Sequence, residues 1–137
     1  MYKKFIFLIL IICASLALCA CNKPTAVILF NKYPITKENM LENSNEFMAG
    51  KKIYYLFMTE DPLETKLIRV MVIKREEKAN FALSKIVYSN DFRLNKDQVF
   101  YYNDYLVFYD AGYYCMKIYS KDDLERPIVI GDFRVIR

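Results

Sequence analysis

Apolar residues follow two different patterns along the chain. From Phe5 to Leu18 they form a run of fourteen residues without a charge. After residue 25 they recur in segments of five to nine residues, separated by charged residues or by Pro, Gly, Asn and Asp, which favour turns. Short apolar segments between turn signals are typical of β-strands, whereas helices need longer stretches with a period of 3.6 residues.

The segments after residue 25 predict seven or eight strands and no long helix. Two of them, 52–58 and 67–74, are apolar at both alternating sets of positions, which favours inner strands of a sandwich. Asn103-Asp104 separates two pieces and is either a hairpin turn or a bend in one long strand. The predicted strands are 26–30, 52–58, 67–74, 81–88, 98–102, 105–109, 112–119 and 128–136.

Local signals refine this pattern in four places. Pro34 excludes a central strand nearby, because proline cannot donate to a sheet ladder. Thr36 is placed to cap a short helical turn, and residues 89–97 are predicted to be a loop. Gly131, inside the last predicted strand, suggests a bulge or a bend.

The segment Asp110-Ala-Gly-Tyr-Tyr-Cys115 resembles the penultimate strand of immunoglobulin-like domains, where Gly or Ala and then Tyr enter the strand at a tyrosine corner. With the strand count, this favours a single immunoglobulin-like antiparallel β-sandwich over residues 26–137. The body lacks tryptophan and a second cysteine, so the disulfide core of antibody domains is not expected. Tyr114 is predicted to point inward, which places Cys115 on the outer face or at a sheet edge.

The beginning of the chain has the features of a secretory signal peptide. Lys3 and Lys4 precede the apolar run, which is short for a membrane span of about twenty residues. The run ends in Leu18-Cys19-Ala20-Cys21, which resembles the lipobox of bacterial lipoprotein precursors, although Cys19 departs from the usual Ala, Ser, Thr or Val. The resemblance implies cleavage after Ala20 and diacylglycerol, with fatty chains such as palmitate, on the sulfur of Cys21.

These features predict three parts: a signal peptide over 1–20, a lipidated cysteine with a short tether over 21–25, and the sandwich over 26–137. An uncleaved membrane helix over 2–20 is the alternative. The resemblance places the protein in the bacterial cell envelope, anchored in a membrane. Asn22 stands where aspartate signals inner-membrane retention in enteric bacteria, which favours the outer membrane where one exists.

Charge and residue content exclude several classes of function. Lys and Arg exceed Asp and Glu by 20 to 16, and removing Lys3 and Lys4 leaves 18 against 16. These charges are interspersed, so nucleic-acid binding, which needs a concentrated basic face, is not expected. The chain has no histidine, which excludes serine–histidine catalysis and histidine-ligated zinc. We therefore expect no enzyme, no cofactor and no metal site, with the acidic pairs in loops as solvated charges.

The four cysteines do not predict a disulfide scaffold. Cys13 and Cys19 belong to the predicted signal peptide and Cys21 to the anchor, which leaves Cys115 alone. Its neighbours are tyrosines and a methionine, so a packing role is expected.

Aromatic residues are concentrated between 100 and 114, where strand alternation should leave about half of them outside the core. Tyrosine on an exposed sheet is a common contact residue. We therefore predict that four tyrosines contribute to a partner-binding face. They are Tyr101, Tyr105, Tyr109 and Tyr113.

The predicted function is that of a lipid-anchored, non-enzymatic binding or assembly module with a protein partner. An envelope glycan is a less favoured ligand, because tryptophan is missing. The alternatives are a structural subunit of an envelope complex and a hydrolase that uses carboxylates alone.

Overall fold

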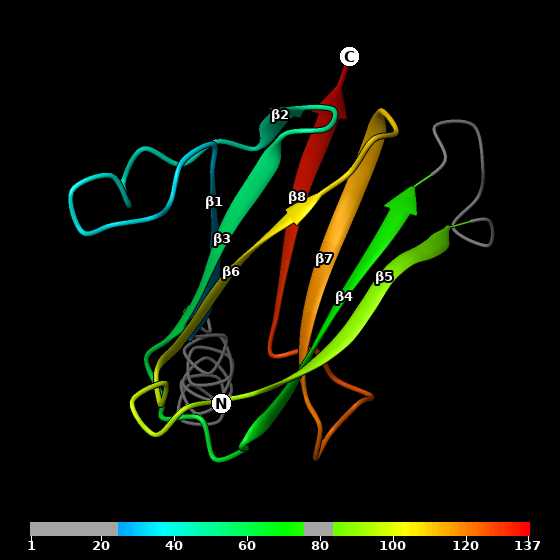
Figure 1. Ribbon diagram of the computed structural model, residues 1–137. Coiled ribbons are helices and arrows are strands. Elements are labelled where there is room, and N and C mark those ends of the chain that lie inside the picture. The colour runs from blue at the N-terminus through cyan, green and yellow to red at the C-terminus, as the bar shows by residue number, and fades with distance from the viewer. Residues whose placement is uncertain (1–24, 76–83) are drawn as a thin grey trace, which may run out of the picture.

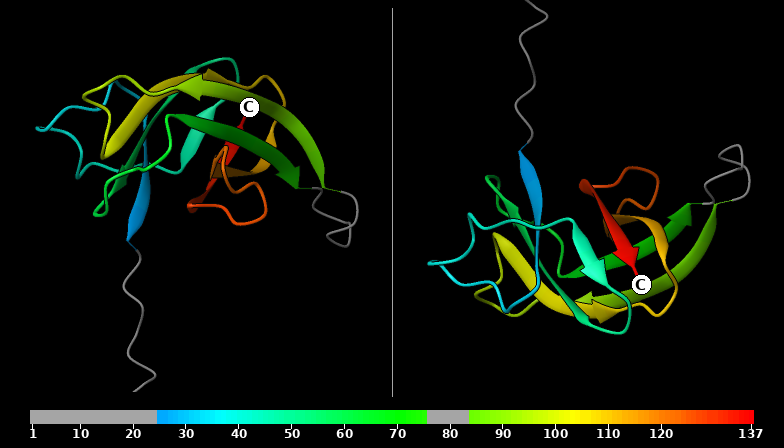
Figure 2. Two further views of the ribbon diagram at one scale, coloured as in Figure 1. Left: turned by 90° about the horizontal axis from the view of Figure 1, so that it is seen from below. Right: turned by 90° about the horizontal axis from the view of Figure 1, so that it is seen from above.

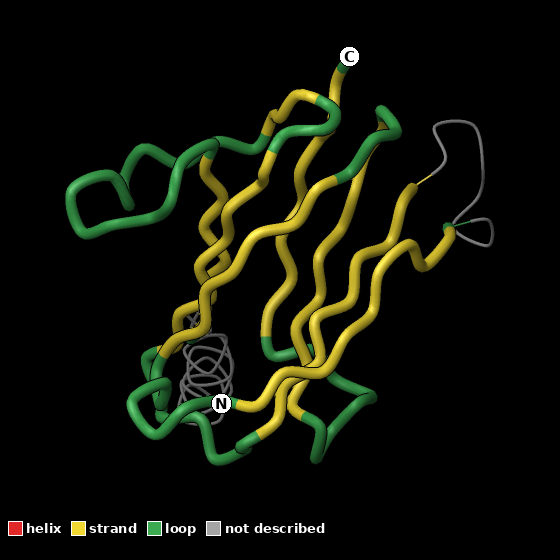
Figure 3. The backbone as a smooth tube through the Cα atoms, in the orientation of Figure 1, coloured by secondary structure: helices red, strands yellow, loops and turns green. Residues whose placement is uncertain are grey.

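The computed structural model describes residues 25–75 and 84–137, which form eight strands and no helix (Figures 1 and 3). Within these two ranges no helix has the length and apolarity needed to cross a bilayer. The strands are β1 (Ala26–Asn31), β2 (Glu46–Met48), β3 (Lys52–Thr59), β4 (Leu67–Arg75), β5 (Lys85–Arg93), β6 (Tyr101–Val107), β7 (Gly112–Ser120) and β8 (Val129–Ile136).

The strands form two sheets that face each other as a sandwich (Figure 2). One sheet has the order β1-β3-β6 and the other the order β2-β8-β7-β4-β5. All pairs among the described strands are antiparallel except β2 with β8, which is parallel. Immunoglobulin-like domains place strands A, B and E in one sheet and strands C, F and G in the other. The same division is seen here when β1, β3 and β6 are matched to A, B and E, and β4, β7 and β8 to C, F and G. The prediction of an all-β sandwich of seven or eight strands is confirmed.

The core lies between the sheets and contains the inward positions of every strand. β3 and β4 supply its centre, because their alternate apolar residues are almost fully buried while the residues between them are partly exposed. Phe133 of β8 lies among four aromatic rings from both sheets and the β6–β7 connection. These rings are Phe30, Phe47, Phe108 and Tyr114, with centroids 5.1, 6.2, 5.8 and 5.3 Å from that of Phe133.

The open question about Asn103-Asp104 is settled by β6, which runs through both residues as one strand and pairs with β3 along its length. The alternation continues through the pair, with Asn103 exposed on the outer side. Asp104 lies on the inner side, where its Oδ2 accepts a hydrogen bond of 3.1 Å from the Tyr102 hydroxyl. Of the two alternatives, the single strand is therefore confirmed and the hairpin is wrong, and the strand is shorter than the two predicted pieces together.

β5 begins and ends later than the predicted segment 81–88, of which residues 81–83 lie outside the described part. The predicted loop 89–97 contains the second half of this strand. The sequence misled because β5 is an edge strand whose side chains are mostly exposed, with Tyr88 and Phe92 half-buried against the core. Its polar residues thus face solvent on a strand and do not mark a turn.

An ion-pair cluster holds this edge strand to its neighbours. Asp91 of β5 accepts from Arg69 of β4 at 2.8 Å and from Lys121 after β7 at 2.8 Å. Arg69 and then Lys121 hold the pKa of the Asp91 carboxyl well below its usual range. The carboxylate therefore stays charged and links three segments of the five-stranded sheet.

Two local predictions are also wrong. Thr36 caps no helix: its N–H donates to Oδ1 of Asn39 at 2.8 Å, and the residues that follow form only a turn. The register of β7 with β8 continues regularly across Gly131, so the bulge is wrong, whereas the alternative of a bend is not tested by the register. Gly131 is needed for another reason, since a Cβ at this position would lie 2.9 Å from Cε2 of Phe30 in the facing sheet.

The tyrosine corner is present at the start of β7. The hydroxyl of Tyr114 donates to the carbonyl oxygen of Asp110 at 2.6 Å, and the side chain points inward as predicted. Met116 stands two residues later, where antibody domains carry their second core cysteine. Cys115 lies on the opposite, outer face. β7 is nevertheless an interior strand of its sheet, and Cys115 is 1% exposed, so the thiol is neither at an edge nor on the surface.

Candidate functional site

The residues singled out from the sequence do not form one site. Cys21 lies outside the described residues. Tyr101 and Tyr105 point outward from β6 on the three-stranded sheet, whereas Tyr113 points outward from β7 on the opposite side of the sandwich. Tyr109 lies in the connection between these strands and is 78% exposed. The structure therefore brings two of the four tyrosines together and separates the other two, and a role in binding stays a prediction.

The outer side of the three-stranded sheet is an apolar face. In the pairing register, Met58 lies between Val27 and Tyr101, and Leu56 lies between Leu29 and Asn103. The apolar face, as named here, consists of Val27, Leu29, Tyr54, Leu56, Met58, Tyr101, Asn103, Tyr105 and Val107.

The apolar face contains no charged side chain. Lys52 is the charged residue among the outward positions of these three described strands, and it lies at one end of the apolar face. Its Nζ is 4.2 Å from the centre of the Tyr105 ring. Val27 and Tyr105 are exposed at 40% and 44%, and most of the others are partly exposed. Contiguous exposed apolar surface of this kind marks interaction sites more often than isolated surface residues do.

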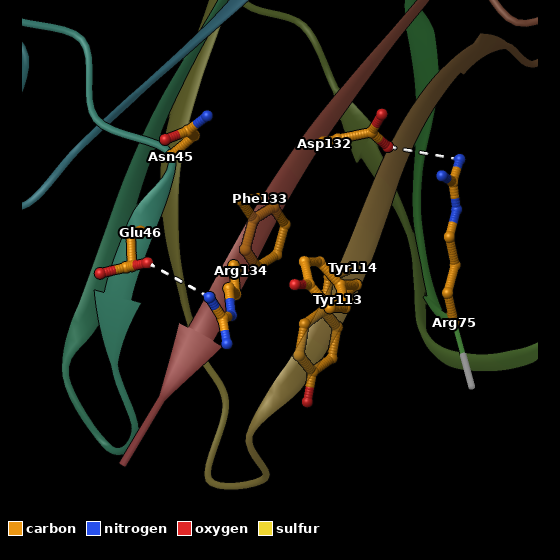
Figure 4. Close-up of a pocket in the computed structure, with 8 residues that line it drawn as sticks. All are labelled: Asn45, Glu46, Arg75, Tyr113, Tyr114, Asp132, Phe133 and Arg134. Carbon is orange, nitrogen blue, oxygen red and sulfur yellow. Dashed lines mark ion pairs between the residues drawn. The ribbon is translucent and has the colours of Figure 1, made fainter. Parts of the chain in front are cut away.

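The five-stranded sheet carries a charged concavity of about 450 Å³ on the other side of the molecule (Figure 4). Parallel pairing of β2 with β8 places Glu46 beside Arg134, and antiparallel pairing of β7 with β8 places Tyr113 opposite Arg134. Arg75, at the end of β4, lies on the far side of Tyr113. The lining residues are Asn45, Glu46, Arg75, Tyr113, Tyr114, Asp132, Phe133 and Arg134.

Two long ion pairs span this concavity. Arg75 approaches Asp132 at 3.4 Å, and Arg134 approaches Glu46 at 3.7 Å while its guanidinium lies 5.1 Å from the Tyr113 ring centre. All four charged side chains are about half exposed. Exposed pairs of this kind contribute about 0–1 kcal/mol each, so both arginines are free to exchange their partners for groups on a ligand.

Cys115 lies beside this concavity without the properties of a nucleophile. Burial raises the pKa of its thiol, and the hydrogen bond to Asp132 raises it further, while Arg75 acts in the opposite direction. The thiol is thus held protonated, whereas reactive cysteines have a lowered pKa. Cys115 is a free cysteine, as expected.

A second concavity, of about 350 Å³, lies at the end of the sandwich where β1 begins. It includes Thr25 and brings together Asp61, Glu64 and Asp122 from two of the acidic loops noted in the sequence, with no lysine or arginine among its lining residues. All three carboxylates are exposed. Although these three line one concavity, no three Cys, Asp or Glu side chains in the described ranges are arranged so that they could hold a metal ion.

Sequence reasoning missed the charged concavity. Asp132 and Arg134 alternate with Phe133 and Val135 in the sequence, and that alternation could have placed them on the outer face of the last strand. Their neighbour Glu46 could not have been found, because it belongs to a three-residue strand without a sequence signal.

Comparison with known proteins identifies no family. No protein-family model matches the chain, and no curated protein matches it either. Among solved structures, the chain is similar to the crystal structure of the soluble domain of PmoD from Methylocystis sp. (strain Rockwell). The two are 12% identical in sequence, with a TM-score of 0.49, over 80% of this chain and 90% of that one. At this similarity the comparison adds nothing about function.

Proposed function

We propose that this chain is a lipid-anchored protein of the bacterial cell envelope that acts as a non-enzymatic binding or assembly module. In this proposal, the chain is exported, cleaved after Ala20 and acylated on Cys21. The sandwich then takes a protein partner at the charged concavity.

The position of β1 relative to the lipobox-like motif supports the anchor. β1 begins at Ala26, so only residues 22–25 separate Cys21 from the sandwich. Four residues span at most about 14 Å when extended. Two acyl chains on Cys21 would hold a protein stably at a membrane, whereas one chain holds it only marginally. The motif and the sandwich are thus adjacent but separate, as expected for an anchor followed by its domain.

The composition of the charged concavity supports a protein partner. Arginine and tyrosine are enriched at protein interfaces, and here Arg75, Arg134 and Tyr113 lie together beside two carboxylates. A site with both signs of charge in fixed places suits a peptide or protein surface with complementary charges.

Replacing Cys21 by serine should remove the anchor. The wild-type protein, extracted from membranes of a bacterial host, should have a mass that begins at Cys21 and includes diacylglycerol. The Cys21→Ser protein should lack the added mass. Intact-mass spectrometry measures both. The matched control is Cys115→Ser, which removes the buried thiol and should leave the acyl mass unchanged. The proposal would be contradicted if the wild-type mass matched a chain that begins at Met1, or a chain without acyl groups.

Reversing the charge of both arginines in the concavity should weaken partner binding. We expect Arg75→Glu with Arg134→Glu to lose proteins that cross-link to the wild type in intact cells, because the concavity then carries four carboxylates and no cation. The control reverses two exposed cations elsewhere, Lys66→Glu with Lys96→Glu, for the same change in net charge. Quantitative mass spectrometry of the cross-linked products compares the three. Equal losses in both double variants would count against the concavity as the binding site.

A further inference from the structure

We propose that the apolar face lies on the surface of the lipid bilayer, so that the charged concavity on the other side of the sandwich points away from the membrane. This inference rests on the proposed lipid anchor and adds an orientation to it. Four features of the structure support lipid as the occupant of this face.

The first is the chemistry of the apolar face. A bilayer interface accepts apolar side chains and tyrosine, whose ring is apolar and whose hydroxyl stays hydrated. Tyr54, Tyr101 and Tyr105 supply such rings, around aliphatic side chains of β1 and β3. Lys52, at the end of the face, has a stem long enough for its ammonium to reach lipid phosphates.

The second is the place where the tether enters the fold. β1 is an edge strand of the three-stranded sheet, and its first outward residue, Val27, already belongs to the apolar face. Residues 22–25 limit the distance between Cys21 and Ala26 to at most about 17 Å. An acyl group on Cys21 would therefore hold the membrane surface close to one corner of this face.

The third is the charge at the end of the sandwich from which the tether leaves. If the domain stood on this end, it would press the second concavity, with Asp61, Glu64 and Asp122, against the membrane. Anionic lipid headgroups repel carboxylates and attract lysine and arginine. An upright orientation is therefore disfavoured, and lying on the uncharged apolar face avoids the repulsion.

The fourth is the loop 32–45, which projects on the side of the three-stranded sheet that faces away from the five-stranded sheet (Figures 1 and 2). Asn31 points outward from β1, and its amide donates to the carbonyl oxygen of Glu42 in this loop at 3.0 Å. The loop exposes Tyr33 and Leu41, at 70% and 93%. These side chains give the domain a second apolar contact, at the end of the face far from the tether.

Environment-sensitive fluorophores on the two outer faces test this orientation. Asn103→Cys places a label on the apolar face, and Ile130→Cys places a matched label on the outer side of β8, both at exposed positions. Cys115 is buried and should not react. The acylated full-length products are inserted into vesicles of phosphatidylethanolamine and phosphatidylglycerol that contain a nitroxide-labelled lipid. We expect several-fold stronger quenching, and a bluer emission, for the label at 103 than for the label at 130.

Charged substitutions on the apolar face provide the second arm. Leu29→Glu with Met58→Glu should abolish the quenching at 103 while the acylated protein stays with the vesicles, because the face then repels lipid but the anchor remains. Both side chains are partly exposed, and circular dichroism confirms that the variant is folded. Unchanged quenching in this variant would overturn the inference.

Intact mass of the same samples separates the two proposals. If the mass shows no acyl group, the proposed function and this orientation both fall. If the acyl group is present but the labels at 103 and 130 are quenched equally, or 130 more strongly, the anchor stands and the orientation alone is wrong.

Discussion

Replacing Phe133 by alanine should lower the free energy of unfolding by about 3–5 kcal/mol, the usual range for removing a buried phenylalanine. The ring is 3% exposed and stacks on Tyr114 at 5.3 Å, with an interplanar angle of 5°. Its loss leaves a cavity where aromatic residues from both sheets meet. Urea denaturation followed by circular dichroism measures the change.

Two further variants make this result specific. Ile130→Ala removes an exposed side chain from the outer face of the same strand and should change the stability by less than about 0.5 kcal/mol. Phe133→Leu keeps part of the side-chain volume, so its free energy of unfolding should fall by less than that of the alanine variant. An alanine variant no less stable than Ile130→Ala would show that Phe133 is not central to the core.

Replacing Gly131 by alanine should destabilise the sandwich by about 1–3 kcal/mol, the typical cost of overpacking a core. In an open strand the same change would stabilise by roughly 0.5–1 kcal/mol, because glycine is the more flexible residue in the unfolded chain. Here the new methyl group would meet the Phe30 ring at 2.9 Å and Cβ of Ile28 at 3.3 Å. The expected sign is therefore reversed by the close approach of β1 to β8.

A double-mutant cycle identifies the cause. Phe30→Leu alone should destabilise, because it shrinks a buried side chain. In that background, Gly131→Ala should lose less stability than it does in the wild type, since the clash with the ring is gone. A coupling energy near zero would mean that Phe30 is not what makes glycine necessary.

The strands that the sequence predicted well are those whose two faces differ in a regular way or are both apolar. β3, β4 and β7 lie within one residue of the predicted segments at each end, because burial on the core side imposes apolar residues at alternate positions. The predicted segment for β5 was displaced along the sequence, because most side chains of this edge strand are exposed to solvent and give no regular pattern. β2 was missed because it has three residues and depends on parallel pairing with β8, a contact made by the far end of the chain.

The candidate site residues also differ in whether their role depends on neighbouring residues in the sequence or on the topology of the sheets. The lipobox-like motif is local, so its residues can be read directly from the sequence. Tyr114 was assigned inward correctly, because the residues that share its face, Met116 and Ile118, are apolar. The grouping of Tyr113 with Tyr101 could not be tested without the topology, because β6 and β7 follow each other closely in the sequence but belong to different sheets.

The buried thiol of Cys115 makes the protein its own reporter of local opening. A thiol that is 1% exposed, with a raised pKa, reacts with an alkylating reagent only when the groups that cover it on the outer face of the five-stranded sheet move away. Under native conditions the rate of alkylation therefore measures local opening at this part of the sheet, without any denaturant. Variants that weaken the centre of the core should accelerate this reaction, whereas variants on the apolar face should leave it unchanged.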